Sequence, residues 1–292
     1  MKASLTALIH AHEGQFSKGQ RRIAAFISEH YDEAAFMTAF RLGEEVGVSE
    51  STVVRFAAEL GFEGYPQLQK AMQEMIRSKL TVLQRIEVAR ARMRDEEVLQ
   101  SVAAGDIHNI RHTMEEMDKA AFFGAVEAII SARQIYVFGA GSCKALASFL
   151  NHYLKMLLGS RVQLVPVTSQ SEIFEEMLDV DGRDAVIGIS FPRYSSKAAN
   201  TLHYAHSKGA TVIALTDSML SPIAPYASHL LLAHSDMASV VDSLVAPLSV
   251  INALIVAISL KTMETNRGKL EELERLWNDY QVYAPVDKTE QN

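Results

Sequence analysis

The sequence predicts two domains of different class, an all-α domain followed by an α/β domain built on a parallel β-sheet. In the first 80 residues apolar side chains recur at the spacing of one helix face, as at Ile23, Phe26 and Ile27. From about residue 119, short apolar runs alternate with segments of helix length. These runs lack the apolar–polar alternation of a half-exposed sheet, so we expect strands that flanking helices bury on both faces.

These changes of pattern set the expected domain boundaries. We expect a helical domain at residues 1–80, linker helices at 81–118, the α/β domain at 119–284 and a disordered tail at 285–292. The expected strands are Ile135–Phe138, Val162–Val167, Ala185–Ile189, Val212–Leu215 and Leu230–Ala233. After them we expect an apolar helix at 244–260 and a separate amphipathic helix at 268–283.

The composition is ordinary for a globular protein, because 48% of the 292 residues are apolar and 22% are charged. The single cysteine, Cys143, excludes an internal disulfide and suits a reducing compartment. No signal sequence opens the chain, so we expect a cytoplasmic protein. The most apolar run, Leu244–Leu260, is short for a membrane span and contains Pro247 and Asn252, which favours a buried helix and no membrane partner.

The charge is distributed unevenly along the chain. Residues 1–94 carry 13 Lys and Arg against 11 Asp and Glu, whereas the remaining residues are strongly acidic and bring the total to −7. A less acidic N-terminal part suggests nucleic acid as a partner for that part alone.

Two short helices joined by a turn are expected between residues 38 and 62. Leu42 and Val46 face inward one turn apart, Gly47 can end the first helix, and Ser49 suits the N-cap of the second. The buried face of the second helix is expected to consist of Val53, Phe56 and Leu60. This pattern predicts a helix-turn-helix, although a plain helical hairpin would share the same spacing.

The exposed residues of the second helix favour DNA binding over the plain hairpin. Polar side chains gather at its N-terminal turns, where a recognition helix meets base edges and phosphates. The expected DNA-contacting residues there are Ser49, Glu50, Ser51, Thr52 and Arg55. The later turns lack positive charge, so phosphate contacts are expected from Lys18, Arg21, Arg22 and Arg41.

The segment around this helix resembles a known family. It reads Val48-Ser49-x-Ser51-Thr52-Val53-x-Arg55-Phe56-x-x-x-Leu60-Gly61-Phe62-x-Gly64-Tyr65, which is similar to the N-terminal domain of RpiR-type transcriptional regulators. In those proteins a sugar isomerase (SIS) domain that senses phosphorylated sugars follows the helix-turn-helix domain. The resemblance covers essentially the whole chain, and it implies a flavodoxin-like, three-layer SIS domain for the second half.

A basic stretch lies between the two domains. It consists of Arg77, Lys79, Arg85, Arg90, Arg92 and Arg94. One interpretation is a solvated connecting helix, and the other is a helix that lies along the DNA backbone beside the helix-turn-helix.

Ligands of an open parallel sheet bind at the carboxyl ends of its strands, so we expect the ligand-binding residues in the loops that follow the strands. The first loop, Gly139–Lys144, follows a strand and opens a helix, so it can approach an anion closely. It stops at Gly-x-Gly, and Lys144 occupies the third glycine position, so a dinucleotide site is disfavoured. The loop resembles the first SIS ligand loop, with Cys143 where serine is commoner. Its expected ligand residues are Gly141, Ser142 and Cys143, the last as a polar contact and not as a catalytic thiol.

The second loop departs from the family pattern. Ser-x-Ser-Gly-x-Thr is usual here in the SIS family, whereas this chain has Ser190, Pro192 in place of the middle serine, Arg193 in place of the glycine, and Ser195. Arg193 could bind a phosphate or carboxylate of the ligand, or it could pair with an acidic residue across a dimer interface. The expected ligand residues of this loop are Ser190, Arg193, Tyr194 and Ser195.

Three further polar segments follow strands. These are Ser169–Ser171, Thr216–Ser218 and His234–Ser243, and Asp242 in the last of them is an expected ligand residue. Hydroxyls and carboxylates suit a sugar-like ligand, but the same residue types also cap helices.

We expect neither an active site nor a metal or cofactor. No histidine has a recognisable catalytic partner, and His203 and His206 lie three residues apart on a helix without an obvious third ligand. The sequence therefore predicts a DNA-binding transcriptional regulator that binds operator DNA as a homodimer or homotetramer. Its expected effector is a small anionic sugar derivative, either a phosphorylated sugar or a sugar acid. The alternatives are an SIS-fold sugar-phosphate isomerase with an accessory helical domain, and an SIS binding module whose helical domain contacts protein.

Overall fold

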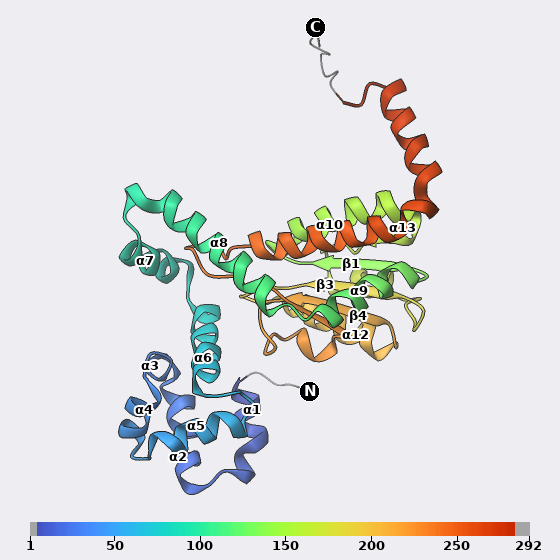
Figure 1. The fold of residues 1–292 in the computed structure, drawn as a ribbon. Helices are drawn as coiled ribbons and strands as arrows, with labels where there is room; N and C mark the ends of the chain where they lie inside the picture. The colour runs from blue at the N-terminus through green and yellow to red at the C-terminus, as the bar shows by residue number, and fades with distance from the viewer. Residues whose placement is uncertain (1–4, 284–292) are drawn as a thin grey trace.

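The computed structural model describes residues 5–283, and the expected tail at 285–292 lies outside them. The chain first forms a bundle of helices and then an α/β domain, and helices α7 and α8 lead from one to the other (Figure 1). The helices of the bundle are α1 Leu5–His12, α2 Lys18–Glu29, α3 Tyr31–Ala34, α4 Ala39–Val46, α5 Glu50–Glu59 and α6 Tyr65–Lys79.

The expected helix-turn-helix is formed by α4 and α5. Gly47 ends α4 with a φ of 66°, a left-handed conformation that glycine adopts without steric cost. Leu42, Val53 and Phe56 are fully buried, together with Leu68 and Met72 of α6 and the apolar face of α2. The two helices thus rest on one apolar core with the rest of the bundle.

Helix α6 is fastened to this bundle by backbone contacts as well as by packing. The hydroxyl of Tyr65 donates to the carbonyl of Met37 at 2.7 Å, and the side-chain amides of Gln69 and Gln73 donate to backbone carbonyls nearby. Burial raises the pKa of Tyr65 to about 12, so the hydroxyl stays protonated and keeps donating. Helix α6 is therefore expected to move with the helix-turn-helix.

The linker expected at 81–118 consists of helices α7 (Val82–Arg92) and α8 (Val98–Glu116), with a short 3₁₀ turn at Asp95–Glu97 between them. Leu80 is extended and separates α6 from α7. The side chain of Thr81 caps α7 by accepting from the backbone N–H of Gln84, and this reciprocal capping box fixes where α7 begins.

The α/β domain contains a five-stranded parallel sheet with the strand order β2-β1-β3-β4-β5. The strands are β1 Ile135–Gly139, β2 Val162–Leu164, β3 Ala185–Ile189, β4 Thr211–Thr216 and β5 His229–Leu232. All five expected strands are confirmed, although β2 is shorter than expected. This order is that of the flavodoxin-like doubly wound sheets.

Helices cover both faces of the sheet, as the apolar strands predicted. One face packs against α9 (Lys119–Ser131), α10 (Cys143–Leu158) and the first part of α13 (Val245–Asp279). The other packs against α11 (Gln170–Glu176) and α12 (Ser196–Ser207). Within β1, Ile135 and Val137 point to the first face and Tyr136 and Phe138 to the second.

The C-terminal helices differ from the expectation. The helices expected at 244–260 and 268–283 are one helix, α13, of 35 residues, because a single Gly268 costs only about 1 kcal/mol in a helix interior. Its buried residues end at Thr262, and its last turns extend beyond the sheet (Figure 1). Among the described residues it is the one helix long and apolar enough to cross a membrane; 39% of its apolar window is buried in the protein.

Candidate DNA-binding surface and effector site

The residues expected to contact DNA lie at the exposed N-terminal end of α5. Ser49 occupies the N-cap position, but its hydroxyl does not cap the helix; it instead lies 3.0 Å from the hydroxyl of Ser51 and 2.8 Å from that of Thr52. Arg55 is exposed, and its Nε donates to the carbonyl of Ser51 at 3.2 Å. Three hydroxyls and a guanidinium therefore lie together at a helix N-terminus, where the helix dipole favours phosphate.

A surface hollow beside α5 includes residues that were not expected at the DNA-binding surface. It is lined by Ser17, Gly19, Gln20, Val48, Ser49, Thr52 and Arg55. Ser17 and Gln20 form a capping box at the start of α2. The N-termini of α2 and α5 thus open onto one hollow, which suits a phosphate backbone. The Ser-x-x-Gln spacing was the sequence signal for this second helix end.

The arginines expected at phosphates are placed differently from one another. Arg22 is exposed, and its Nη1 donates to the carbonyl of Gly47 in the turn between α4 and α5 at 3.2 Å. Arg41 is also exposed, at 3.5 Å from the carboxylate of Glu44. Arg22 therefore supports the turn directly, while the charge of Arg41 is partly balanced by its neighbour.

Arg85 is an exception to both interpretations of the basic stretch. Its side chain is fully buried, so it neither faces solvent nor lies along DNA. Its Nε donates to the carbonyl of Ser239 at 2.9 Å, and its Nη2 donates to the carboxylate of Asp242. Arg90 and Arg94 are exposed, and the side chains of Arg77, Lys79 and Arg92 lie outside the described part of the structure.

The first candidate ligand loop approaches α10 closely. A Cβ atom at Gly139 would lie 2.6 Å from the carbonyl oxygen of Cys143, so only glycine allows α10 to start at this distance from β1. Gly141 has a φ of 61°, Ser142 is exposed, and Cys143 is buried at the first turn of α10. Burial raises the pKa of the Cys143 thiol despite hydrogen bonds with Phe191 and Ser142, which makes it a poor nucleophile.

In the second loop, Arg193 has a left-handed backbone conformation that glycine usually adopts. Arg193 has a φ of 61°, which costs a non-glycine residue about 1 kcal/mol or more. Arg193 is exposed, and Ser190 is almost fully buried. Ser195 takes the N-cap position of α12 without a side-chain capping bond. Arg193 therefore occupies a backbone conformation that favours glycine, the residue that the resemblance led us to expect at this position.

The third loop contributes a carboxyl group with a raised pKa. Asp217 follows β4, and Tyr194 of the second loop donates to its Oδ1 at 2.8 Å. Burial raises the pKa of Asp217 to about 6, against the hydrogen bonds of Tyr194 and Thr216, and the negative charge of Asp242 adds to the effect. The second, third and fourth loops therefore meet at the carboxyl ends of β3, β4 and β5.

The linker helices hold the fourth loop at several points. Besides the contacts of Arg85, the hydroxyl of Ser243 donates to Asp106 at 2.5 Å, and the backbone N–H of His234 donates to the hydroxyl of Thr113 at 2.8 Å. Asp106 and Thr113 belong to α8. The loop expected to bind ligand is thus bonded to both α7 and α8.

Two of the weaker candidates have ordinary structural roles. Ser169 caps α11 in a capping box with Glu172, which supports the capping interpretation of Ser169–Ser171. The rings of His203 and His206 both pack near Tyr226, at 5.1 and 6.1 Å between centroids.

Comparisons with known proteins agree with this architecture. Residues 3–79 match the model of the helix-turn-helix domain of the rpiR family, and residues 128–257 match that of the SIS domain. HexR, an HTH-type transcriptional regulator from Pseudomonas aeruginosa, is 24% identical over 219 residues, which are 73% of each chain. An HTH-type transcriptional regulator from Haemophilus influenzae is 25% identical over 217 residues, which are 74% of each.

Solved structures show the same fold. The sugar isomerase domain of an RpiR transcription factor from Sphaerobacter thermophilus is 31% identical, with a TM-score of 0.58; the match covers 61% of this chain and 99% of that one. The NanR protein of Vibrio vulnificus, solved in complex with ManNAc-6P, is 17% identical with a TM-score of 0.57; the match covers 96% of this chain and 100% of that one.

Proposed function

This chain belongs to the rpiR family of transcriptional regulators, with a helix-turn-helix domain and an SIS domain, and we propose that a small anionic sugar derivative controls its operator binding. The effector binds where the loops after β1, β3, β4 and β5 meet. Its occupancy is transmitted to the helix-turn-helix through α7 and α8.

The observation that carries this proposal is the buried contact between Arg85 and the fourth loop. Helix α6 is bonded to the DNA-binding bundle, whereas Arg85 bonds α7 to the SIS domain, which is the proposed sensor. Only Leu80 and Thr81 separate the two helices. A ligand that moves Asp242 or Ser239 must therefore move or release α7. Coupling requires such an element with two arrangements that both sites can bias.

The charges of the site support an anionic sugar as effector. The N-termini of α10 and α12 favour negative charge, and Arg193 can add a guanidinium. Nη1 of Arg85 is buried and has no hydrogen-bond partner among the described residues, so it is available to an anionic group or a hydroxyl. Asp217 and Asp242 can accept from sugar hydroxyls. Phosphorylated sugars and sugar acids both meet these requirements.

A role in binding without turnover is supported by the state of the reactive groups. The thiol of Cys143 is buried with a raised pKa, and His234 lies 2.8 Å from Glu116, at the side of the fourth loop that faces α8. The relatives that match over most of their length are named transcriptional regulators. We expect the protein to act in the cytoplasm as a homodimer or homotetramer on double-stranded operator DNA, because one recognition helix reads too few base pairs for specificity.

The proposal is tested by measuring the binding of the purified protein to its own upstream DNA. Fluorescence anisotropy would be recorded with and without a panel of hexose 6-phosphates, N-acetylhexosamine 6-phosphates and sugar acids. We expect at least one compound to change the operator affinity, and light scattering to show a dimer or larger. Turnover of a panel compound in a coupled isomerase assay, with no effect on DNA binding, would instead favour an enzyme.

A further inference from the structure

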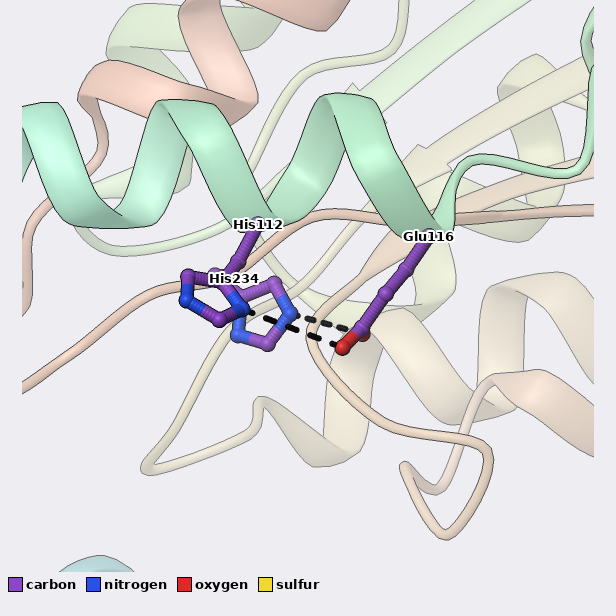
Figure 2. Close-up of side chains that lie close together, drawn as sticks. All are labelled: His112, Glu116 and His234. Atoms are coloured by element: carbon purple, nitrogen blue, oxygen red, sulfur yellow. Dashed lines mark hydrogen bonds and ion pairs between the residues drawn. The ribbon is translucent and has the colours of Figure 1, made fainter.

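Three potential metal ligands converge where α8 meets the loop after β5. His112 and Glu116 lie one turn apart on α8, and His234 comes from the loop (Figure 2). Nε2 of His234 is 2.8 Å from Oε2 of Glu116, and Nδ1 of His112 is 4.0 Å from Oε1 of the same carboxylate. One ligand atom from each of the three residues lies within 4.8 Å of the other two.

These distances are close to those of an occupied metal site. In a tetrahedral zinc site the ligand atoms lie about 2.0–2.1 Å from the ion, which places them roughly 3.3 Å from one another. The His234–Glu116 separation is shorter than this value and the His112–Glu116 separation is longer, and the two involve different oxygens of the carboxylate. Side-chain rotations would therefore be needed to bring one atom of each residue to one ion. Two imidazoles and one carboxylate are also the ligand set of many zinc sites that keep an open position.

The backbone around the cluster is already held in place. The N–H of His234 donates to the hydroxyl of Thr113, which lies one residue from His112 on α8. His112 and Glu116 are four residues apart on one helix, a spacing that places both side chains on the same face. The side chain of His234 is 19% exposed and that of Glu116 is 62% exposed, so an ion from solution can reach the site.

His112 packs between two other imidazole rings, and its centroid lies 4.1 Å from that of His108. Its ring stands edge-on to that of His234, with 5.6 Å between centroids, and directs Nδ1 toward the same carboxylate. Lys70 of α6 also lies near enough to Glu116 to attract it. Two imidazoles thus lie close to one carboxylate, and an ammonium group lies near enough to act on it.

A cavity of about 330 Å³ adjoins the cluster on the side of the DNA-binding domain. It is lined on one side by Glu116 of α8 and by His234 and Asp217 of the α/β domain. On the other side it is lined by residues of the helical bundle, which include Phe62, Gln67 and Lys70. An ion held by the three ligands would have room there for a water molecule or another small ligand in its open position.

We propose that His112, Glu116 and His234 form a binding site for a divalent transition-metal ion of the zinc type at the junction of the two domains. The ion would bind neutral imidazoles and an ionised carboxylate. It would join α8 to the loop after β5 and present an open coordination position to the cavity. The three ligands are not among the residues assigned to the effector, although Asp217 lines the same cavity. A failure to bind metal would therefore leave the proposed regulation of DNA binding intact.

The test is titration of the untagged, chelator-treated protein with Zn²⁺ by calorimetry, and with Co²⁺ by visible absorption. We expect one ion per chain, with Co²⁺ absorption typical of four-coordinate nitrogen and oxygen ligands. His112→Ala, His234→Ala and Glu116→Gln should each weaken binding at least about tenfold. The double variant His203→Ala/His206→Ala is the matched control, because it removes two other histidines from a helix, and it should bind like the parent.

Absence of binding in the parent protein would overturn the proposal. So would parent-like affinity in the three single variants, since the ion would then lie elsewhere. Glu116→Gln leaves an exposed side chain of the same size, so its circular dichroism is expected to match that of the parent. This variant therefore separates loss of a ligand from loss of the fold.

Discussion

Arg85 of the linker helix α7 donates a buried hydrogen bond to Asp242 in the loop after β5, across 157 residues of sequence. Its side chain is fully buried, and that of Asp242 is 13% exposed. A charge removed from water is tolerated only when it is paired and hydrogen-bonded. The pair therefore fixes α7 against the sensor, and it is the physical basis of the coupling that we propose.

Breaking this pair should destabilise the protein strongly. Arg85→Met keeps most of the side-chain volume but leaves Asp242 without its partner, which should cost about 3 kcal/mol in the free energy of unfolding. The double variant Arg85→Met/Asp242→Asn should recover part of that loss, as expected for coupled residues. Urea unfolding measures both effects. Arg90→Ala on the exposed side of α7 is the control and should change stability by less than about 0.5 kcal/mol. Equal stabilities of the Arg85 and Arg90 variants would show that the buried pair contributes nothing.

Arg193 is expected to have opposite effects on stability and on ligand response. Arg193→Gly should be more stable than Arg193→Ala by about 1 kcal/mol, because only glycine adopts a φ of 61° without strain. Both variants remove the guanidinium and should respond less to the effector, since they cannot form a charge-assisted hydrogen bond of about 1.5–3 kcal/mol. Thermal unfolding and effector titration measure the two outcomes. A parent-like effector response in both variants would place Arg193 outside the ligand site, with a structural role or a role between subunits.

Asp217 should make stability depend on pH in the opposite sense to a salt-bridged aspartate. Its folded-state pKa of about 6 exceeds the ordinary value of 3.8, so its contribution to stability is complete below about pH 4 and is lost as the pH rises through 6. The side chain of the Asp217→Asn variant cannot ionise, so the variant does not lose this stability as the pH rises. The stability of the variant relative to the parent should therefore increase between pH 4 and 6, by up to about 3 kcal/mol. Urea unfolding of both proteins across this range measures the difference, and a pH-independent difference would contradict the raised pKa.

The recognition helix can be tested separately from the sensor. Arg55→Ala or Thr52→Ala should weaken binding to the specific operator by about 1–3 kcal/mol for each base that the variant side chain can no longer reach. Binding to unrelated DNA should change much less. Arg267→Ala, on the far end of α13, is the control for removal of a positive charge. Unchanged operator affinity in a correctly folded Arg55→Ala protein would exclude α5 as the helix that reads the bases.

The sequence predicted those parts of the fold that depend on local patterns. The strands were recognisable because each is a continuous apolar run, and α4 and α5 because Gly47 and Ser49 separate two periodic segments. The prediction of two separate helices at 244–260 and 268–283 was wrong. A glycine in a helix interior is only a local signal, which packing and neighbouring helix formers can override.

The contacts between distant segments could not be predicted in the same way. Arg85 belongs to a stretch of arginines that looks solvated, and its burial depends on a loop more than 150 residues away. The convergence of His112 and Glu116 with His234 likewise depends on how α8 packs against the loop after β5. The candidate ligand loops were found because the carboxyl ends of parallel strands always lie at one edge of a sheet.

We propose above all that an effector in the SIS domain controls operator binding through α7. The most direct measurement is the operator affinity of the parent and of Arg85→Met by fluorescence anisotropy, each with and without the panel compound that affects the parent most. In the parent we expect that compound to change the affinity at least about tenfold, a coupling of about 1.4 kcal/mol. In Arg85→Met, studied below its unfolding transition, the two affinities should be nearly equal. No effect of any compound on the parent, or an undiminished effect in Arg85→Met, would contradict the account.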